Sequence, residues 1–317
     1  MTASAPAATP APAATPAPVA AAPAPVTGVP APVTAVPAPV GAAETDRVTV
    51  VVATRDRRER LIETIPEHRA PVILVDNAST DGSPETIAEA FPAVDVIRLG
   101  ENRGAAARNE GVRRAATPYV AFADDDSWWA EGSLARAAAL FDAHPRLGLL
   151  TARVLIGEDA RPDPISAAQA AAPLGSPPGA PGPQVTGFLS CAVVVRREAF
   201  LAAGGFEPRL FVYGEEALLA MDMTAAGWWL CYTPDLVVRH FPLPAGRDTG
   251  ARHRIESRNR LLTALLRRPP SVVARTAVTT LRESPSALWD VTRALPWALR
   301  HRRLLPPSTE AGLRVSG

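Results

Sequence analysis

Residues 48–83 read VTVVVATRDRRERLIETIPEHRAPVILVDNASTDGS, and this stretch decides the class of fold. Two short runs, residues 48–53 and 71–75, are almost wholly apolar and rich in valine and isoleucine. Such runs are typical of strands whose two faces are both covered in a parallel sheet. A charged helical stretch, residues 57–67, joins the two runs. Strand, helix and strand in this order predict a βαβ unit.

The same alternation continues along the chain. Residues 94–99 and 119–123 are further strand-like runs, and helices are expected near residues 84–90 and 105–115. We therefore predict an α/β fold with a mostly parallel central sheet and helices on both of its faces. Ligands bind beyond the carboxyl ends of the strands in such sheets. Later strand-like runs lie at residues 147–155, 185–195, 227–234 and 236–240.

Composition excludes several classes of function. The chain has 317 residues, 47% of them hydrophobic, and 33 basic against 32 acidic residues give a net charge of +1. This balance argues against a nucleic-acid binder, whose surface is usually strongly basic. Every basic residue is an arginine, so a Walker-type phosphate loop and a catalytic lysine are both excluded. Cys191 and Cys231 are expected to be free, buried thiols in a reducing compartment.

The composition along the chain predicts three segments. Residues 1–45 are rich in alanine and proline and have too few large side chains to pack a core, so we expect a disordered tail. A signal peptide would begin with a basic region, which this segment lacks. Residues 46–268 are expected to form the folded domain. Within it, residues 157–184 are expected to be a flexible loop, either a flap over the site or an inert insertion. Residues 269–317 are expected to form a helical extension.

Polar residues follow three of the predicted strands. Thr54 and Arg55 follow the first strand, Asp76 and Asn77 follow the second, and three aspartates, residues 124–126, follow the fourth. Adjacent carboxylates after a buried strand repel one another, and a divalent cation would supply the missing counter-charge. A solvated acidic turn in front of the next helix explains the triplet equally well.

The complete set of motifs resembles the family 2 glycosyltransferases over about residues 48–267. The motifs are DNASTDGS at 76–83, NRG at 102–104, ARNEG at 107–111 and DDD at 124–126. The resemblance implies the GT-A fold of nucleotide-diphospho-sugar transferases. It also implies inverting transfer of a hexosyl or deoxyhexosyl group from a nucleotide-diphosphate-sugar donor to an acceptor hydroxyl, with Mn²⁺ or Mg²⁺ as the cofactor.

The resemblance also implies roles for individual residues. Asp76 would accept a hydrogen bond from the base, and Asp125 would lie near the ribose or the sugar. Asp126 is the expected metal ligand. His240, at the end of a late strand, is the second expected metal ligand, although histidines at strand ends are as often ordinary surface residues. The expected donor-binding residues are Thr54, Arg55, Asp76, Asn77, Arg108, Asp124 and Asp125.

Inverting transfer needs a base within hydrogen-bond reach of the acceptor hydroxyl. Relatives carry an acidic pair for this purpose after a Gly-Gly-Phe motif, which is found here at residues 204–206. Glu216 stands where the family commonly has an aspartate, so its carboxylate is one methylene longer. We expect Glu216 to be the base and keep Glu215 as the alternative. Stabilisation of a helix N-terminus by acidic residues would also explain the pair.

Two other classes of function fit parts of the sequence. A sugar-nucleotide nucleotidyltransferase has a similar sheet but usually needs a lysine-bearing phosphate loop, which this chain lacks. A non-catalytic module that binds nucleotide sugars is the second alternative. Relatives often build cell-envelope polysaccharide or glycolipid, so the expected acceptor is a saccharide or a lipid-linked saccharide.

The C-terminal part of the sequence is basic and amphipathic. Its first stretch, residues 247–260, is rich in arginine and is expected either to bind diphosphate or to form a solvated helix face. Two amphipathic helices, residues 272–282 and 287–303, suit an anionic membrane surface, and packing on the domain explains them as well. No stretch has the roughly 18 apolar residues of a membrane span. We therefore expect a cytoplasmic protein with peripheral contact at the inner face of the cell membrane.

Overall fold

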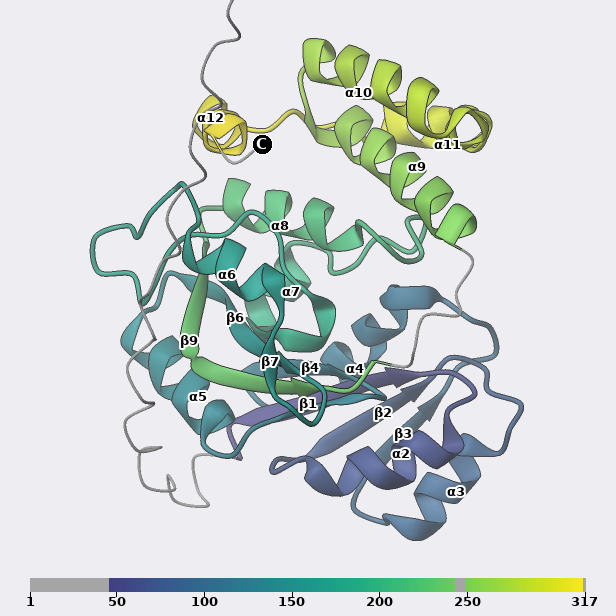
Figure 1. Ribbon diagram of the computed structural model, residues 1–317, viewed down its shortest axis with the longest axis vertical. Coiled ribbons are helices and arrows are strands. Elements are labelled where there is room, and N and C mark those ends of the chain that lie inside the picture. The colour runs from purple at the N-terminus through teal and green to yellow at the C-terminus, as the bar shows by residue number, and fades with distance from the viewer. Residues whose placement is uncertain (1–45, 243–248, 316–317) are drawn as a thin grey trace, which may run out of the picture. The chain divides into compact units, whose positions relative to one another are not determined.

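The computed structural model describes residues 46–242 and 249–315, so the expected tail at residues 1–45 lies outside the described residues. Nine of the described strands form one sheet in the order β3-β2-β1-β4-β8-β6-β9-β5, with β7 paired to β6 (Figure 1). The strands are β1 Val48–Thr54, β2 Val72–Asp76, β3 Asp95–Arg98, β4 Tyr119–Asp124, β5 Ser127–Trp129, β6 Leu147–Ile156, β7 Arg161–Pro162, β8 Val193–Arg196 and β9 Trp229–His240.

The first four strands of the sheet are parallel, as the sequence predicts. β1 pairs with β2 and β4, and β3 pairs with β2. The register places Thr54 opposite Asp76 and Ala53 opposite Asp124. The carboxyl ends of β1, β2 and β4 therefore meet at one edge of the sheet, where ligands of such folds bind.

The second half of the sheet is mixed. β8 runs antiparallel to both β4 and β6, β9 runs parallel to β6, and β5 runs antiparallel to β9. The pairing of β5 with β9 sets Ser127 opposite His240. The end of the late strand β9 thus lies beside the aspartate triplet that precedes β5.

Helices cover both faces of the sheet (Figure 1). Successive residues of a strand point to opposite faces, so Val50 and Val52 pack with α2, α3 and α5, whereas Val51 packs with α4, α7 and α8. The helices on the two faces are α2 Arg58–Thr64, α3 Ser83–Ala90, α4 Arg108–Arg114, α5 Ser133–Ala143, α7 Arg197–Ala202 and α8 Glu215–Ala225. Short 3₁₀ turns are η1 Ile65–Glu67, η2 Gly104–Ala107 and η3 Ser190–Ala192.

The C-terminal helices pack on α8 through a third apolar cluster. In this cluster Leu218 of α8 meets Leu262 and Leu266 of α9 and Trp297 of α11. The helices are α9 Thr249–Arg267, α10 Pro270–Glu283, α11 Pro285–Arg300 and α12 Pro307–Val315. α9 packs against α10 and α11, so the helical part of the chain begins before the boundary at residue 269 that the sequence suggested. No helix of the described residues is long and apolar enough to cross a membrane.

Three segments differ in detail from the sequence-based expectation. The run 185–195 forms only the short strand β8, preceded by irregular backbone and the turn η3. The three residues of β5 were not expected to form a strand. The two runs at 227–234 and 236–240 form the single strand β9, which has an irregular register opposite Ala152 and Arg153 of β6.

The segment 157–184 contains regular structure that its composition hid. The helix α6, Pro164–Ala170, begins after Asp163, whose carboxylate accepts a hydrogen bond from the Ile165 backbone nitrogen at 2.9 Å. Two side chains of α6 fasten it to β6: the Ser166 hydroxyl accepts a bond from the Val154 nitrogen, and Gln169 bonds Thr151, both at 2.9 Å. These contacts hold α6 against β6.

The cysteines and the tandem tryptophans also have defined places. Cys191 and Cys231 are free and buried, as predicted. Trp129 lies in the core and donates from Nε1 to the Phe122 carbonyl oxygen at 3.0 Å. Its neighbour Trp128 stacks on Phe241 with ring centroids 4.8 Å apart. One tryptophan of the pair therefore supports the sheet and the other covers its edge.

Candidate active site

The residues expected to bind a donor gather where β1, β2 and β4 end. Thr54 donates from its hydroxyl to the Asp125 carboxylate at 3.0 Å. Asp76 is 2% exposed and accepts a hydrogen bond from the Ser79 backbone nitrogen at 3.1 Å, which closes the turn after β2. Arg55 is exposed and lies 3.4 Å from the Asp56 carboxylate.

Asn77 contributes to this edge of the sheet by forming hydrogen bonds with backbone groups of a neighbouring loop. Its carboxamide oxygen accepts a bond from the Arg103 nitrogen at 2.9 Å, and its Nδ2 donates to the Gly104 carbonyl oxygen at 3.0 Å. Gly104 has φ +58°, and a Cβ there would lie 2.3 Å from the Phe211 carbonyl oxygen. Only glycine fits this approach, so Asn77 and Gly104 fix the segment that leads to Arg108.

Each carboxylate of the aspartate triplet has its own surroundings. Asp124 forms an ion pair with Arg108, whose side chain is almost fully buried. Burial raises the pKa of Asp125 to about 6, and the charges of Asp124 and Asp126 add to this rise. Asp126 is 8% exposed, and its Oδ1 is buried without a hydrogen-bond partner.

His240 lies beside the unpartnered oxygen of Asp126. The His240 Nε2 is 3.3 Å from Asp126 Oδ1, a contact that lacks the geometry of a hydrogen bond. Burial lowers the pKa of His240, but the adjacent Asp126 and the charges of Asp124 and Asp163 raise it above its ordinary value overall. No three His, Cys, Asp or Glu side chains of the described residues form a metal cluster. A buried, unpartnered carboxylate oxygen next to an imidazole nevertheless fits two ligands of a divalent cation.

The acidic pair Glu215-Glu216 opens helix α8 after a strained loop. Phe211 and Tyr213 have φ values of +67° and +65°, and Gly214 precedes the helix with φ +105°. Glu215 is 3% exposed, and its Oε2 has no hydrogen-bond partner. Burial, and then the charge of Glu216, raise the pKa of Glu215.

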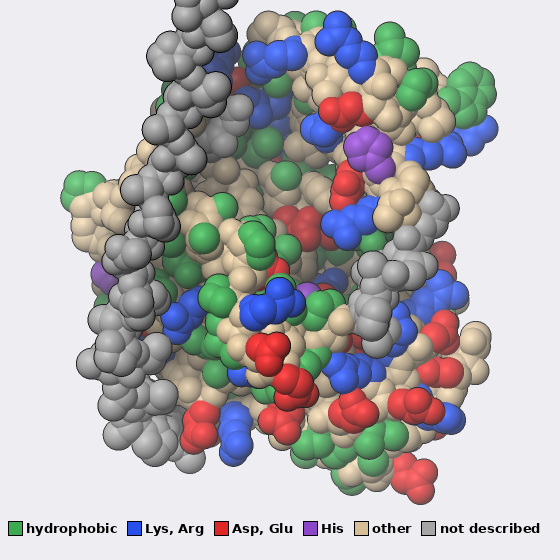
Figure 2. Space-filling view, in the orientation of Figure 1, with side chains coloured by type: hydrophobic (Ala, Val, Ile, Leu, Met, Phe, Trp, Pro, Cys, Tyr) green, Lys and Arg blue, Asp and Glu red, His purple; other side chains and the backbone are tan. Residues whose placement is uncertain are grey.

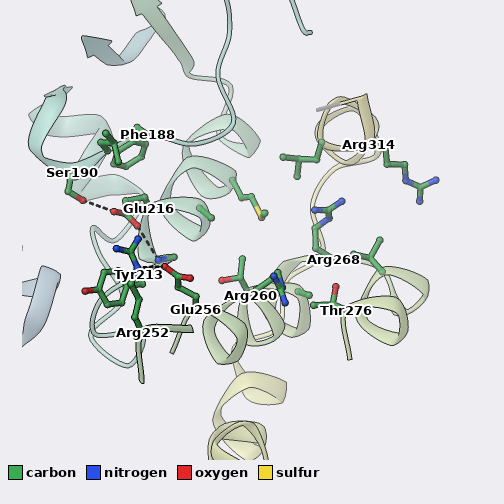
Figure 3. Close-up of a pocket in the computed structure, with 18 of the residues that line it drawn as sticks. Phe188, Ser190, Tyr213, Glu216, Arg252, Glu256, Arg260, Arg268, Thr276 and Arg314 are labelled. Carbon is green, nitrogen blue, oxygen red and sulfur yellow. Dashed lines mark hydrogen bonds and ion pairs between the residues drawn. The ribbon is translucent and has the colours of Figure 1, made fainter. Parts of the chain in front are cut away.

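Glu216, in contrast, is anchored at the surface of a cavity. Its carboxylate accepts hydrogen bonds from the Ser190 hydroxyl at 2.9 Å and from the Gly214 nitrogen at 3.2 Å. The cavity, part of whose lining Figure 3 shows around Glu216 and Ser190, has a volume of about 1030 Å³. Asp124 and His240 line it as well. The expected base Glu216, the expected donor-binding residue Asp124 and the expected metal ligand His240 therefore line the same cavity.

Asn259 is a buried residue of this region that the sequence analysis did not single out. Its Nδ2 lies 2.7, 2.9 and 2.8 Å from the carbonyl oxygens of Leu210, Val212 and Tyr213. These carbonyl groups belong to the strained loop before Glu216, so Asn259 holds that loop on α9. A polar residue on the buried apolar stripe of α9 is the sequence signal that would have identified it.

The arginine-rich stretch is a network of ion pairs and backbone contacts. Arg252 pairs with Glu256 and Arg254 pairs with Asp290, each at 2.7 Å. Arg258 donates to the Arg209 carbonyl oxygen at 2.9 Å. Arg252 and Arg260 of this stretch line the cavity, whereas Arg254 and Arg258 do not.

Comparisons with known proteins agree with this geometry. Residues 49–201 match the sequence model of the family described as glycosyl transferase family 2. A Mycobacterium tuberculosis protein, N-acetylglucosaminyl-diphospho-decaprenol L-rhamnosyltransferase, is 29% identical over an alignment 247 residues long, which covers 64% of this chain and 79% of that protein.

Two solved structures share the fold. The mannosyltransferase PcManGT from Pyrobaculum calidifontis, in complex with GDP-Man and Mn²⁺, superimposes with a TM-score of 0.52 at 23% identity, over 84% of this chain and 74% of that one. Residues 1–349 of TarS from S. aureus, in complex with UDP, superimpose with a TM-score of 0.51 at 17% identity, over 84% and 91%.

The fold and the family match define this chain as a nucleotide-sugar glycosyltransferase with the GT-A fold. Among such enzymes, those of glycosyl transferase family 2 are the ones that residues 49–201 match.

Proposed function

We propose that this protein transfers a hexosyl or deoxyhexosyl group, with inversion, from a nucleotide-diphosphate sugar to the hydroxyl group of a saccharide or lipid-linked saccharide acceptor. The observation that carries the proposal is the position of Glu216. Its anchored carboxylate faces a cavity that Asp124 and His240 also line. A base on one side and the strand ends on the other suit single displacement at a sugar carbon.

The donor would bind at the carboxyl ends of the parallel strands. Asp76 accepts a hydrogen bond from the base, Arg55 and Thr54 contact the nucleotide, and Arg108 faces the base or the diphosphate. Asp124 keeps Arg108 in place through their ion pair. Asn77 acts through the loop that it holds.

Asp126 and His240 would hold a divalent cation, Mn²⁺ or Mg²⁺. The unpartnered Asp126 Oδ1 beside His240 supports this assignment. When bound, the cation would neutralise negative charge that develops on the leaving diphosphate. Asp125, hydrogen-bonded to Thr54, would lie near the ribose or the sugar.

Glu216 would act as the base. Its carboxylate takes the proton of the acceptor hydroxyl while the hydroxyl oxygen attacks the anomeric carbon, and the bond to the diphosphate breaks on the opposite face. The bonds from Ser190 and Gly214 hold the carboxylate toward the cavity before the acceptor arrives. Burial favours the neutral form of Glu215, which reduces the repulsion that its charge would exert on Glu216.

We propose an acceptor of the cell-envelope type. The Mycobacterium relative is named as a rhamnosyltransferase that acts on a diphospho-decaprenol-linked sugar. A cavity of about 1030 Å³ is at the upper end of the usual range for small-molecule sites, so it has room for more than one sugar ring. Both features support a lipid-linked saccharide.

We further propose that α11 lies on an anionic membrane surface. Trp289 and Leu299 are 62% and 55% exposed on its outer face, and the Arg293 guanidinium lies 5.4 Å from the Trp289 ring centroid. Figure 2 shows apolar and basic side chains mixed over α10 and α11. The one carboxylate of α11, Asp290, is paired with Arg254. Basic and apolar side chains without free acidic groups complement anionic lipid headgroups.

A donor screen tests the proposed reaction. UDP-, GDP- and dTDP-sugars are incubated with the protein and Mn²⁺, and the release of nucleoside diphosphate is followed by mass spectrometry. Release with one of these donors, abolished by Asp126→Ala, is expected. A protein that binds a donor yet releases no nucleoside diphosphate, with or without a saccharide acceptor, would be a non-catalytic module instead.

A further inference from the structure

The cavity in front of Glu216 is charged differently at its two ends. Its lining includes the carboxylates of Glu216, Asp124 and Asp163, and it includes Arg252, which is paired with Glu256. Arginines from three C-terminal helices line the remainder, and Figure 3 shows Arg268 and Arg314 across the cavity from Ser190 and Glu216. These arginines, which we call the arginine end, are Arg260 of α9, Arg268 directly after α9, Arg275 of α10 and Arg314 of α12.

The arginine end carries more positive charge than its carboxylate partners neutralise. Arg268 and Arg314 share one carboxylate, Glu310, at 2.7 and 3.2 Å. Arg260 pairs with Glu283. Arg275 is exposed and has no hydrogen bond or ion pair among the residues that the structure describes. Four guanidinium groups thus face two carboxylates, which leaves two positive charges in excess.

Buried contacts organise this cluster. The Arg268 side chain is 14% exposed, and its backbone carbonyl oxygen accepts a hydrogen bond from Arg302 at 2.7 Å. Glu310 is 8% exposed and ties α12 to Arg268, the residue that follows α9. Arg268 is therefore held in one orientation, while Arg275 and Arg314 remain accessible from the cavity.

We propose that the arginine end binds a phosphate or diphosphate group of the acceptor while the acceptor hydroxyl lies at Glu216. This inference rests on the proposed glycosyl transfer and specifies its acceptor class. Guanidinium groups bind phosphate oxygens through paired hydrogen bonds, which neutral sugars do not offer. Thr54 and Asp76, which would hold the donor nucleotide, are not among the described residues that line this cavity. The donor diphosphate is proposed to lie at the cation held by Asp126 and His240, and neither of these residues belongs to the arginine end.

The test compares two probes that differ only in the diphosphate. One is a short-chain prenyl diphospho-N-acetylglucosamine, and the other is the same prenyl N-acetylglucosaminide without the diphosphate. Binding of each to the full-length protein is measured by isothermal titration at 150 mM NaCl, where surface charges more than about 8 Å apart are screened. The diphospho probe should bind at least tenfold more tightly.

Variants assign this preference to the arginine end. Arg275→Gln and Arg314→Gln should each weaken binding of the diphospho probe by roughly tenfold, because each removes a charge-assisted hydrogen bond. Neither should change binding of the neutral probe. Arg282→Gln is the matched control, since Arg282 is an exposed arginine of α10 outside the cavity. Equal affinity for both probes, or equal losses in all three variants, would overturn the inference.

A competition experiment separates acceptor from donor. Saturating UDP, GDP or dTDP with Mn²⁺ should leave the affinity for the diphospho probe within a few-fold. Full displacement of the probe by one of these nucleotides would assign the arginines to the donor and overturn the inference. Because these measurements need no turnover, they stay decisive if no donor is consumed; absence of donor consumption would count against the proposed transfer alone.

Discussion

Two adjacent glutamates, Glu215 and Glu216, differ in surroundings and therefore in expected role. Glu216→Gln keeps the shape and hydrogen-bonding reach of the side chain but cannot take a proton. Loss of a general base commonly costs about 10²–10⁴ in rate. We expect kcat to fall by this order, with donor affinity within a few-fold of the parent because the donor residues lie on other elements. Steady-state kinetics and donor titration measure the two effects.

The neighbouring variant is the control for this prediction. Glu215→Gln replaces a carboxyl group whose buried neutral form is favoured, so it should leave kcat within about tenfold of the parent. The proton-transfer assignment moves to Glu215 if its variant loses turnover while Glu216→Gln remains active.

The burial of the His68 ring predicts how the free energy of unfolding depends on pH. Both of its ring nitrogens are buried without hydrogen-bond partners, and burial lowers its pKa to about 4. In the unfolded chain the pKa is near 6.5, so the unfolded state binds more protons between these values. This residue's contribution to stability is thus present above pH 6.5 and is lost as the pH falls to 4, by about 3 kcal/mol in total.

His68→Leu should remove this part of the pH dependence. Chemical denaturation at pH 7 and pH 4.5 would show a smaller loss of unfolding free energy in the variant than in the parent. The control is His253→Leu, because His253 is an exposed histidine. Parallel stability curves for the parent and His68→Leu would contradict the prediction.

At the scale of elements, the loop before α8 is held by α9. Asn259→Leu removes the only donor side chain shown to bond the carbonyl groups of Leu210, Val212 and Tyr213 among the described residues. The Leu210 carbonyl oxygen keeps its bond from the Val212 nitrogen, but the carbonyl groups of Val212 and Tyr213 lose this partner, and a carbonyl group left without a partner costs about 1–3 kcal/mol. We expect the unfolding free energy to fall by about 2–3 kcal/mol and kcat to fall by about tenfold or more, because Glu216 follows this loop.

Ser257 on the same helix provides a matched control. It is also fully buried, but its hydroxyl has no hydrogen-bond partner. Ser257→Ala should change the unfolding free energy by less than about 1 kcal/mol and leave kcat unchanged. Similar losses in both variants, measured by urea unfolding and kinetics, would show that general packing of α9, and not the Asn259 bonds, supports the loop.

The elements that the sequence predicted well are those with a strong local signal. The strands β1, β2 and β4 were placed within a residue or two because burial on both faces requires continuous apolar runs. The helix α6 also had a local signal, Asp163 at the N-cap and Pro164 after it, which the surrounding Pro, Ala and Gly obscured. By contrast, β5 exists because Ser127–Trp129 pair with a strand more than 100 residues away, and no local pattern reports that pairing.

The candidate site likewise combines features that have a local sequence signal with features that depend on the tertiary structure. Motifs placed the acidic residues at strand ends, and the register of β1, β2 and β4 brings those ends together. Which glutamate of an adjacent pair faces the cavity depends on how α8 is rotated, and the role of Asn259 depends on carbonyl groups 46–49 residues away. The arginine end joins three helices, so only the tertiary structure brings its members to one cavity.

At the scale of the whole molecule, a protein that acts on lipid-linked acceptors should bind membranes through α11. The outer face of α11 carries Trp289, Leu299, Arg293 and Arg300, all exposed. Sedimentation with vesicles of phosphatidylcholine, with and without phosphatidylglycerol, measures this binding. We expect binding to need the anionic lipid and to weaken as the salt concentration rises, because headgroup attraction is screened.

Variants locate this contact. Each basic residue near an anionic surface contributes about 1 kcal/mol, so Arg293→Gln with Arg300→Gln should weaken partitioning by roughly 10- to 30-fold. The control replaces two exposed arginines of the sheet domain, Arg98→Gln with Arg136→Gln, which removes the same charge from other surfaces. A comparable loss in the control would mean that net charge alone drives binding. Undiminished partitioning of the α11 variant would exclude this helix as the contact and leave membrane association to other parts of the chain.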